Sequence, residues 1–389
     1  MKMLLQGAAF AAALALSTGA ALAADAVKIG VVTTLSGPAG YLGEDIRDGF
    51  LLAVKLEGGT LGGVPVNVLV EDDTLDPGKG KQIAERMLKQ ENAKIVTGTV
   101  FSNVLLAIAP TVTGAGAFMI SPNAGPSQLA GKGCDKNLFV ASWQNDTLHE
   151  AAGKYATDAG YKRMVILAPN YAAGRDSLTG FKRYYKGEVV EVYTKLNQSD
   201  FAAEMARIRD EKPDAIYQAH PGGPGISFAK QYVQAGLMKT IPMVVPLPGI
   251  DDRILRALGE DAAGIISTSQ WNLDLDNPAN KRFVAEFQKA YGRVPTDYAS
   301  QAYDTAHLVA SALKAVAGDM TRTDAFRAAL MKADFAAVRG KFKFGHNHFP
   351  IQDVYLRRVE KTADGKIVNR TIGTVFKDHG DAYAGDCKM

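Results

Sequence analysis

Short runs of β-branched and other apolar residues alternate with longer amphipathic stretches along most of the chain. In the first half this pattern predicts strands at 27–33, 64–70, 94–97 and 117–120, separated by helices at 42–56, 77–90 and 103–112. Strands that alternate with helices are typical of βαβ units, in which helices cover a parallel sheet. The first half is therefore predicted to form one doubly wound lobe.

The same alternation starts again after Trp143. Strands are predicted at 163–167, 189–193, 215–217, 243–245 and 265–268, with helices at 147–159, 177–185, 201–211, 226–235 and 251–258. Helices at 280–291, 299–317 and 323–332 follow, and the tail contains strands at 354–359 and 368–375 around an Asp364-Gly365 turn. Since no Pro- or Ser-rich tether separates the halves, we expect several chain crossings and a hinge between two lobes.

The first residues have the features of an export signal. Lys2 supplies a positive charge, 4–16 is apolar, and Ala21-Leu22-Ala23 is a signal-peptidase pattern, so we predict cleavage after Ala23. A membrane anchor is the alternative, but this Ala-rich run is shorter than the roughly 20 apolar residues that a spanning helix needs. We therefore predict a signal peptide at 1–23 and a periplasmic location.

Composition narrows the class of protein further. A chain of 389 residues suits two domains better than one core. Its formal net charge is only +3, with Lys and Arg dispersed, which does not favour nucleic-acid binding. Only Cys134 and Cys387 are present, and in an oxidising compartment a disulfide is expected, with two free thiols as the alternative. Closing so long a loop stabilises the fold by about 4 to 5 kcal/mol in the chain-entropy model.

Small and polar residues follow several strands of the predicted first lobe. They lie in Leu35-Ser36-Gly37-Pro38-Ala39-Gly40-Tyr41-Leu42-Gly43, in Gly98-Thr99-Val100-Phe101-Ser102-Asn103 and in Ser121-Pro122-Asn123-Ala124-Gly125. Open α/β sheets bind ligands beyond the carboxyl ends of their strands, and glycines and helix starts there suit an anion. A plain tight turn, and a helix cap at Ser102, remain the alternative interpretations.

Taken in order, these segments resemble the periplasmic branched-chain amino acid binding protein family of ABC importers. The Ile29-Gly30 strand, the Leu35-Ser36-Gly37-Pro38 turn, the Glu71-Asp72-Asp73 strand end and Ile120-Ser121-Pro122 carry the resemblance, from about residue 27 to about 359. It implies a type I two-lobed α/β fold with three hinge crossings. We accordingly divide the chain into 24–142 plus about 273–345 and 143–272 plus about 346–389.

The resemblance also implies a function and a set of contacts. A monomeric receptor without cofactor or metal would capture a solute and deliver it to an ABC permease in the inner membrane. The ligand carboxylate would meet the Ser102 side chain and the amides of Asn123 and Gly125, although Gly125 replaces a hydroxyl residue often found there. The second lobe would contribute Tyr171 and the segment 219–221, and Tyr298 matches an aromatic lid position.

The sequence departs from amino-acid-binding relatives at Pro246-Leu247-Pro248-Gly249, where those proteins present a glutamate for the ligand ammonium group. A buried ammonium without a carboxylate partner is costly. We therefore favour an aromatic or other apolar acid, such as a benzoate or phenylpropanoid derivative, over a branched-chain or other amino acid. Tyr303 would add to the aromatic surface, although ordinary core packing is expected for about half of these aromatic residues. The residues expected around the ligand are Tyr41, Phe101, Ser102, Asn123, Ala124, Gly125, Trp143, Tyr171, His220, Pro248 and Tyr298.

Other functions find less support. G-x-S-x-G, H-E-x-x-H and G-x-x-x-x-G-K-[ST] motifs are absent, so His220-Pro221-Gly222-Gly223 has no nucleophile motif beside it and no enzyme is expected. His346-Asn347-His348 lacks further metal ligands and is interpreted as a solvated turn. A receptor that signals to a membrane partner would share the same lobes, and the sequence does not separate it from a transport protein.

Overall fold

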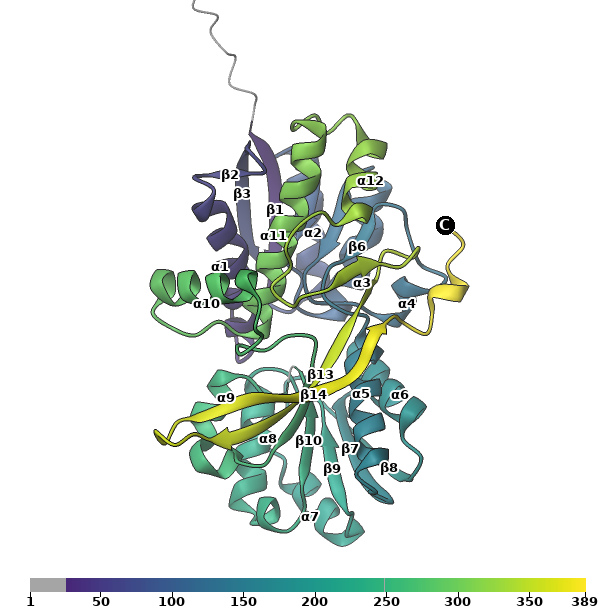
Figure 1. The fold of residues 1–389 in the computed structure, drawn as a ribbon. Helices are drawn as coiled ribbons and strands as arrows, with labels where there is room; N and C mark the ends of the chain where they lie inside the picture. The colour runs from purple at the N-terminus through teal and green to yellow at the C-terminus, as the bar shows by residue number, and fades with distance from the viewer. Residues whose placement is uncertain (1–25, 248) are drawn as a thin grey trace, which may run out of the picture.

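The computed structural model describes residues 26–247 and 249–389 of the chain. Two α/β lobes stand one above the other, each built on its own sheet (Figure 1). The predicted fold class, two lobes with parallel sheets covered by helices, is confirmed. The predicted signal peptide with its cleavage after Ala23, and Pro248, lie outside the described residues.

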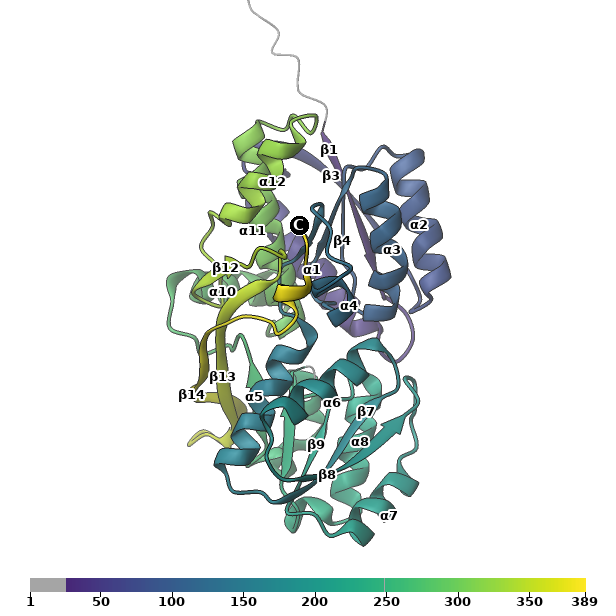
Figure 2. The ribbon, with the colours of Figure 1, turned by 90° about the vertical axis from the view of Figure 1, so that its right-hand side faces the viewer.

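The first lobe contains a six-stranded sheet in the order β2-β3-β1-β4-β5-β6, parallel except for the β2–β3 pair. Its elements are β1 Val27–Thr33, α1 Gly40–Leu56, β2 Thr60–Leu61, β3 Val64–Asp72, α2 Pro77–Lys89, β4 Ile95–Thr97, α3 Ser102–Gly114, β5 Phe118–Ser121, α4 Ser127–Ala130, β6 Leu138–Val140, α10 Pro278–Tyr291, α11 Asp297–Val316 and α12 Thr323–Lys332. Figure 2 shows α2 and α3 on one face of this sheet and α11 and α12 on the other.

The core of this lobe follows from the sequence pattern. Ile29, Val31 and Val32 of β1 are all buried, as expected for a parallel strand covered on both faces. Helix α1 packs along α11 at very short range, because a Cβ at Gly49 would lie 2.1 Å from the carbonyl oxygen of Ala299. Glycine at this position therefore lets α11, which is distant in sequence, complete the first lobe.

The second lobe is built on a sheet in the order β12-β13-β11-β10-β9-β7-β8, with β14 paired to β13. Its elements are α5 Asn145–Asp158, β7 Arg163–Pro169, α6 Ala172–Tyr184, β8 Glu188–Thr194, α7 Ala202–Glu211, β9 Ala215–Gln218, α8 Gly223–Gln234, β10 Met243–Pro246, α9 Asp252–Leu258, β11 Ile266–Ser269, β12 Phe342–Phe344, β13 Pro350–Lys361 and β14 Ile367–His379. Three 3₁₀ turns lie at Leu237–Lys239, Gly259–Ala262 and Ala384–Asp386. The strands β7 to β11 are parallel, while β12, β13 and β14 are antiparallel additions.

The chain passes between the lobes after β6, after β11 and between α12 and β13. Beyond β14 the tail turns back to the first lobe, where the predicted disulfide joins Cys387 to Cys134 (Figure 2). The segment that follows the second-lobe sheet is therefore fastened covalently to the first lobe. Our division of residues between the lobes stays a prediction.

Several helices begin earlier than the apolar pattern predicts. α6 starts at Ala172 instead of 177, and α8 at Gly223 instead of 226. Their first turns consist of small residues, because the helix folds back directly over the strand end. A Cβ at Gly174 would lie 1.7 Å from the carbonyl oxygen of Pro169, and one at Gly225 2.3 Å from that of His220. The early starts bring these helix ends to the strand edge that faces the other lobe.

Candidate functional site

Helix α3 begins at the strand edge where the sequence places an anion site. Its N-cap is Phe101, and no side-chain oxygen caps the helix. Ser102 is its first residue and is buried, and its Oγ accepts a hydrogen bond from Asn145 Nδ2 at 3.1 Å. The Ser102 hydroxyl therefore does not act as a helix cap, and the positive end of the helix dipole remains available to an anion.

The loop after β5 lies beside this helix start. Asn123 donates from Nδ2 to the carbonyl oxygen of Val100 at 2.6 Å, while its Oδ1 and its backbone N–H have no partner among the described residues. The amide of Ala124 donates to the Thr99 carbonyl oxygen at 3.3 Å. Asn123 thus has a buried side-chain oxygen and a backbone N–H that both lack a partner among the described residues. It lies beside Ser102 at the same edge of the first-lobe sheet.

Gly125 has a different environment from the one expected. Its amide donates to Asn145 Oδ1 at 3.2 Å, so in this closed structure it is already paired. A Cβ here would lie 2.2 Å from the carbonyl oxygen of Trp143, which explains why no hydroxyl residue occupies the position. The Trp143 side chain is buried with Leu148 and Leu247 of the second lobe, as in ordinary core packing.

Asn145 links the predicted contacts but was not among them. It is the first residue of α5, directly after the first crossing, and its side chain binds Ser102, Gly125 and Asp176. Asp176 belongs to the second lobe and also accepts hydrogen bonds from the amide and hydroxyl of Ser127. In the sequence, Asn145 lies in Ser142-Trp143-Gln144-Asn145-Asp146, at the point where the second series of elements begins.

The second-lobe strand ends are engaged mainly within their own lobe. The His220 ring is buried, with Nε2 2.9 Å from Thr194 Oγ1 and Nδ1 3.0 Å from Gln218 Oε1, and it stacks on Phe228. Burial lowers the pKa of His220 to about 3, so the ring is neutral. Gln218 Nε2 has no partner among the described residues and faces Gly249 in the loop after β10. Sequence reasoning missed this donor, which directly precedes the segment 219–221.

Aromatic residues meet across the gap between the lobes. Tyr171, the N-cap residue of α6, is partly buried, and its ring centroid lies 6.3 Å from that of Phe101. Tyr298 of α11 is buried, and burial raises the pKa of its hydroxyl. Tyr303 instead packs against Phe283 and His307 in the first lobe. This environment matches the ordinary core packing that was expected for about half of these aromatic residues.

The lobes touch directly, so the structure is closed. The Gly223 amide of α8 donates to the Pro38 carbonyl oxygen at 3.1 Å. Tyr41 of α1 donates its hydroxyl hydrogen to Asp251 Oδ2 at 2.8 Å, and Arg253 lies 4.3 Å from the centroid of the Tyr41 ring. We call the Tyr41–Asp251 contact the latch. It joins the loop after β1 and α1 to the start of α9.

Asp251 places an acid close to the loop after β10, although no acid stands at 246–249 itself. It lies five residues beyond Pro246 and caps α9 through a hydrogen bond from the Ile254 amide to Oδ1. Burial raises the pKa of the Asp251 carboxyl. From the sequence, Asp251 is expected only as the start of the helix 251–258, because a capping aspartate is common at that position.

The segment 346–348 is also different from the solvated turn that we expected. Asn347 and His348 are buried, and the His348 ring stacks on Phe139 with 4.0 Å between the centroids. Asn347 Nδ2 donates to the Ala130 carbonyl oxygen and to Asp381, each at 2.9 Å. The turn is held inside the third crossing, because it connects β12 and β13 next to the first lobe.

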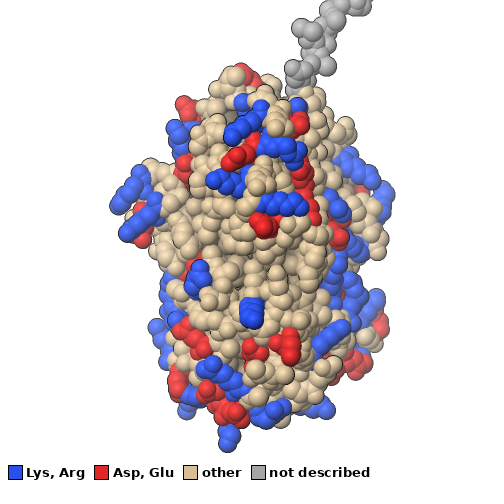
Figure 3. All heavy atoms as spheres, turned by 180° about the vertical axis from the view of Figure 1, so that it is seen from behind, with Lys and Arg blue, Asp and Glu red and all other residues tan. Residues whose placement is uncertain are grey.

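The surface has mixed charge. Figure 3 shows Lys and Arg interspersed with Asp and Glu on the rear face. Within the residues that the structure describes, no helix combines the length and hydropathy that a membrane span requires. The same residues contain no group of three or more His, Cys, Asp or Glu placed to hold a metal ion.

Comparison with known proteins agrees with this geometry. A family model described as periplasmic binding protein matches residues 26–366. Leu/Ile/Val-binding protein homolog 6 of Brucella melitensis is 30% identical over 373 residues, which cover 92% of this chain and 93% of that protein.

Solved structures show the same fold. A solute-binding protein of an ABC transporter from R. palustris, in complex with benzoate, is 33% identical with a TM-score of 0.88, covering 94% of this chain and 100% of that one. Another, from Rhodopseudomonas palustris BisB5 in complex with 3,4-dihydroxybenzoic acid, is 29% identical with a TM-score of 0.85, covering 92% and 99%. These relatives are transport receptors and not enzymes, which confirms that expectation. The chain belongs to the periplasmic binding protein family, as a solute-binding protein of the ABC-transporter type.

Proposed function

We propose that this protein captures a small carboxylate-bearing solute, with an aromatic acid favoured, between its lobes and delivers it to an ABC permease. The observation that carries the proposal is the pairing of an uncapped helix start at Ser102 with the unpaired amide of Asn123. Both lie at the carboxyl edge of one parallel sheet, where α/β folds place ligands. Amides and a hydroxyl at a helix N-terminus are complementary to a carboxylate.

The aromatic preference rests on two further observations. Phe101 and Tyr171 approach each other from opposite lobes, so a flat ring bound there would contact an aromatic side chain from each. The solved relatives described above were obtained with benzoate and with 3,4-dihydroxybenzoic acid. An aromatic acid matches both the anion edge and this apolar pair.

A branched-chain amino acid is the second candidate, and Asp251 is the observation that favours it. Its buried carboxylate stands near the loop where amino-acid-binding relatives present an acid, and the curated relative is named a Leu/Ile/Val-binding protein. In the closed structure, however, Oδ2 accepts the Tyr41 hydroxyl and Oδ1 the Ile254 amide. Engagement of both oxygens leaves this acid poorly placed to bind an ammonium group as well.

Calorimetric titration with benzoate, 4-hydroxybenzoate, cinnamate and leucine tests the proposal. We expect saturable binding of at least one aromatic acid at a stoichiometry of at least one, and little heat with leucine. Tight leucine binding without any response to the aromatic acids would refute the aromatic preference.

Two variants at the latch separate the candidates. Tyr41→Phe removes the latch but keeps the Asp251 carboxylate, whereas Asp251→Asn keeps the size of the side chain but removes its charge. If the ligand lacks an ammonium group, both variants should weaken its binding to a similar extent. A loss of leucine binding in Asp251→Asn that Tyr41→Phe does not reproduce would support the amino-acid candidate.

Location and assembly complete the proposal. Membership of this family implies export to the periplasm, and we propose that cleavage follows Ala23. N-terminal sequencing of the secreted protein would test this site, and light scattering would test the proposed monomer. A first residue other than Ala24, or a concentration-independent dimer, would contradict these proposals.

A further inference from the structure

A cavity of about 590 Å³ lies beside the second crossing, apart from the proposed solute site. Its walls come from α9 with the two residues before it, from the crossing 271–274, from the loop 294–297, and from β13 and β14. None of Phe101, Ser102, Asn123, Gly125 or Tyr171 lines it. The cavity is therefore bounded by both lobes but separate from the residues that carry the proposed carboxylate site.

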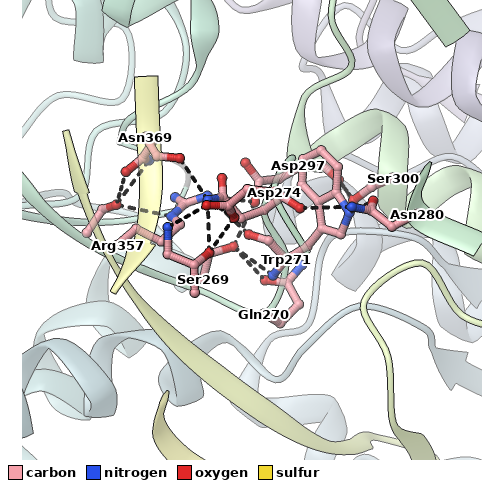
Figure 4. A network of polar contacts seen from close by, with 12 residues as sticks. Ser269, Gln270, Trp271, Asp274, Asn280, Asp297, Ser300, Arg357 and Asn369 are labelled. Atoms are coloured by element: carbon pink, nitrogen blue, oxygen red, sulfur yellow. Dashed lines mark hydrogen bonds and ion pairs between the residues drawn. The ribbon is translucent and has the colours of Figure 1, made fainter. Parts of the chain in front are cut away.

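Arg357 of β13 lines this cavity and is almost completely buried. Figure 4 shows this side chain within a network of polar contacts. Its Nε donates to Ser267 Oγ at 3.1 Å, and its Nη1 donates to the Trp271 carbonyl oxygen at 3.2 Å and to Asp297 Oδ1 at 3.3 Å. Its Nη2 has no hydrogen-bond partner among the described residues. A buried guanidinium donor without an acceptor is unfavourable, and an acceptor bound in the cavity would relieve that cost once a small rotation of the Arg357 side chain turns Nη2 toward it.

The other lining residues indicate what kind of molecule fits. Eight apolar side chains contribute to the walls: Ile250, Leu255, Trp271, Leu273, Val294, Pro295, Ile367 and Val368. The lining carboxylates Asp251, Asp252, Asp274 and Asp297 balance the lining cations Arg256, Arg357, Lys366 and Arg370 in number. Since these charges offset each other, a multiply charged anion such as phosphate has little advantage. The walls favour an apolar body with one acceptor group.

We propose that this cavity is a second ligand site, which binds a small apolar monocarboxylate with its carboxylate on Arg357 Nη2. The size of the cavity falls within the range of small-molecule sites, and its apolar walls match the body of such a ligand.

Occupancy of this site favours the closed arrangement. Ile250 and Leu255 belong to the second lobe, whereas Val294 and Pro295 belong to the first, so a ligand between them contacts both. Asp251 lines the cavity and is also the acceptor of the latch. A molecule that binds the closed arrangement better than the open one shifts the population toward closure, and the coupling to the solute site is reciprocal. This coupling rests on the proposed function, but occupancy of the cavity does not.

Crystals grown with 4-bromobenzoate, together with calorimetry of the same compound, test the second site. We expect anomalous bromine density in the cavity next to Arg357 and a stoichiometry above one if the Ser102 site binds the compound too. Density in the cavity alone would support the second site and contradict the aromatic preference of the solute site. Density at Ser102 alone, with a stoichiometry of one, would overturn the second site and leave the proposed function intact.

Two variants would test the second ligand site in solution. Val294→Phe fills the cavity without removing a buried charge, and Arg357→Lys keeps the charge beside Asp297 but removes the Nη2 donor. Each should weaken the binding of 4-bromobenzoate in the cavity by about tenfold or more, equivalent to about 1.4 kcal/mol. Ile372→Phe, at an exposed position of β14 outside the cavity lining, is the matched control. It should leave binding unchanged both in the cavity and at the Ser102 site. If Val294→Phe folds normally and binds 4-bromobenzoate as the unmodified protein does, the second site is refuted.

Discussion

The two lobes share one architecture but present different chemistry at their facing edges. In the first lobe, Asn123 keeps a buried oxygen and an amide without partners among the described residues, next to the uncapped start of α3. In the second lobe, both ring nitrogens of His220 are bonded to neighbours of the same lobe. The first lobe is therefore preorganised for a ligand, whereas the second mainly supplies a rigid surface that closes over it through the latch.

The largest effect is expected from removing the disulfide that links the two lobes. The double variant Cys134→Ser/Cys387→Ser releases the tail that connects the second-lobe sheet to the first lobe. Because the disulfide joins residues 253 apart, its loss should lower the free energy of unfolding by about 5 kcal/mol in the chain-entropy model. Chemical denaturation would measure this. An unchanged denaturation midpoint would show that the tail does not restrain the unfolded chain.

Removal of the Ser102 hydroxyl tests the polar edge of the first lobe. Ser102→Ala should weaken binding of the solute, with benzoate as the first probe, by about 1 to 3 kcal/mol, because a buried carboxylate loses a hydrogen-bond donor. Ser311→Ala is the matched control, since Ser311 Oγ donates to the Leu308 carbonyl oxygen within α11. Calorimetry would compare the two variants. Equal affinities for benzoate would remove Ser102 from the site.

Loss of the latch tests the closing role of the second lobe. Tyr41→Phe leaves the buried Asp251 oxygen without its hydroxyl donor, which should cost about 2 kcal/mol in the closed arrangement. Solute should therefore dissociate faster, while its association rate changes little. Stopped-flow fluorescence would measure both rates. A change confined to association would show that the contact does not stabilise closure.

His220 provides the smallest and most specific test of the second lobe. Burial lowers its pKa to about 3 in the folded protein, whereas an unfolded histidine titrates near 6.5. As the pH falls below 6.5, the unfolded chain binds a proton that the folded chain excludes, so His220 makes stability fall by about 1.4 kcal/mol per pH unit.

Replacement of this residue isolates its contribution. His220→Gln should lower stability at pH 7 but remove this slope, so the difference between the variant and the unmodified protein should shrink toward pH 4.5. Urea denaturation at several pH values would measure it. Parallel pH profiles of the two proteins would mean that His220 is protonated in the folded state and is not buried as described.

The sequence placed most elements well, and the errors have a common cause. β1 was predicted with its observed bounds, because buried parallel strands are continuous apolar runs. The starts of α6 and α8 were predicted late, since their first turns contain small residues without apolar periodicity. β6, a strand of only three residues, was not predicted, because so short a run has no readable period.

The residues of the candidate site also fall into those that the sequence predicted and those that it did not. Ser102 and Asn123 were predicted from their positions after strands, and the structure places both on one edge. Asn145 and Asp251 were missed, because Asn145 precedes the predicted helix 147–159 and Asp251 is expected only as the start of the predicted helix 251–258. The opposite case also occurs, in which the residue type is compatible with a binding site but the side chain packs in a core or at a crossing. Examples are Trp143, Tyr303 and the buried His348.

The sequence by itself determined the two-lobed α/β architecture, the disulfide partners and the first-lobe strand ends, because these follow from local periodicity, cysteine count and positions next to strands. The tertiary structure decided which atoms remain unpaired, which acid forms the latch and where a cavity opens beside Arg357. Those features depend on contacts between residues up to 210 positions apart, as in the Tyr41–Asp251 pair. No local pattern records such contacts, since they arise only when the lobes close on each other.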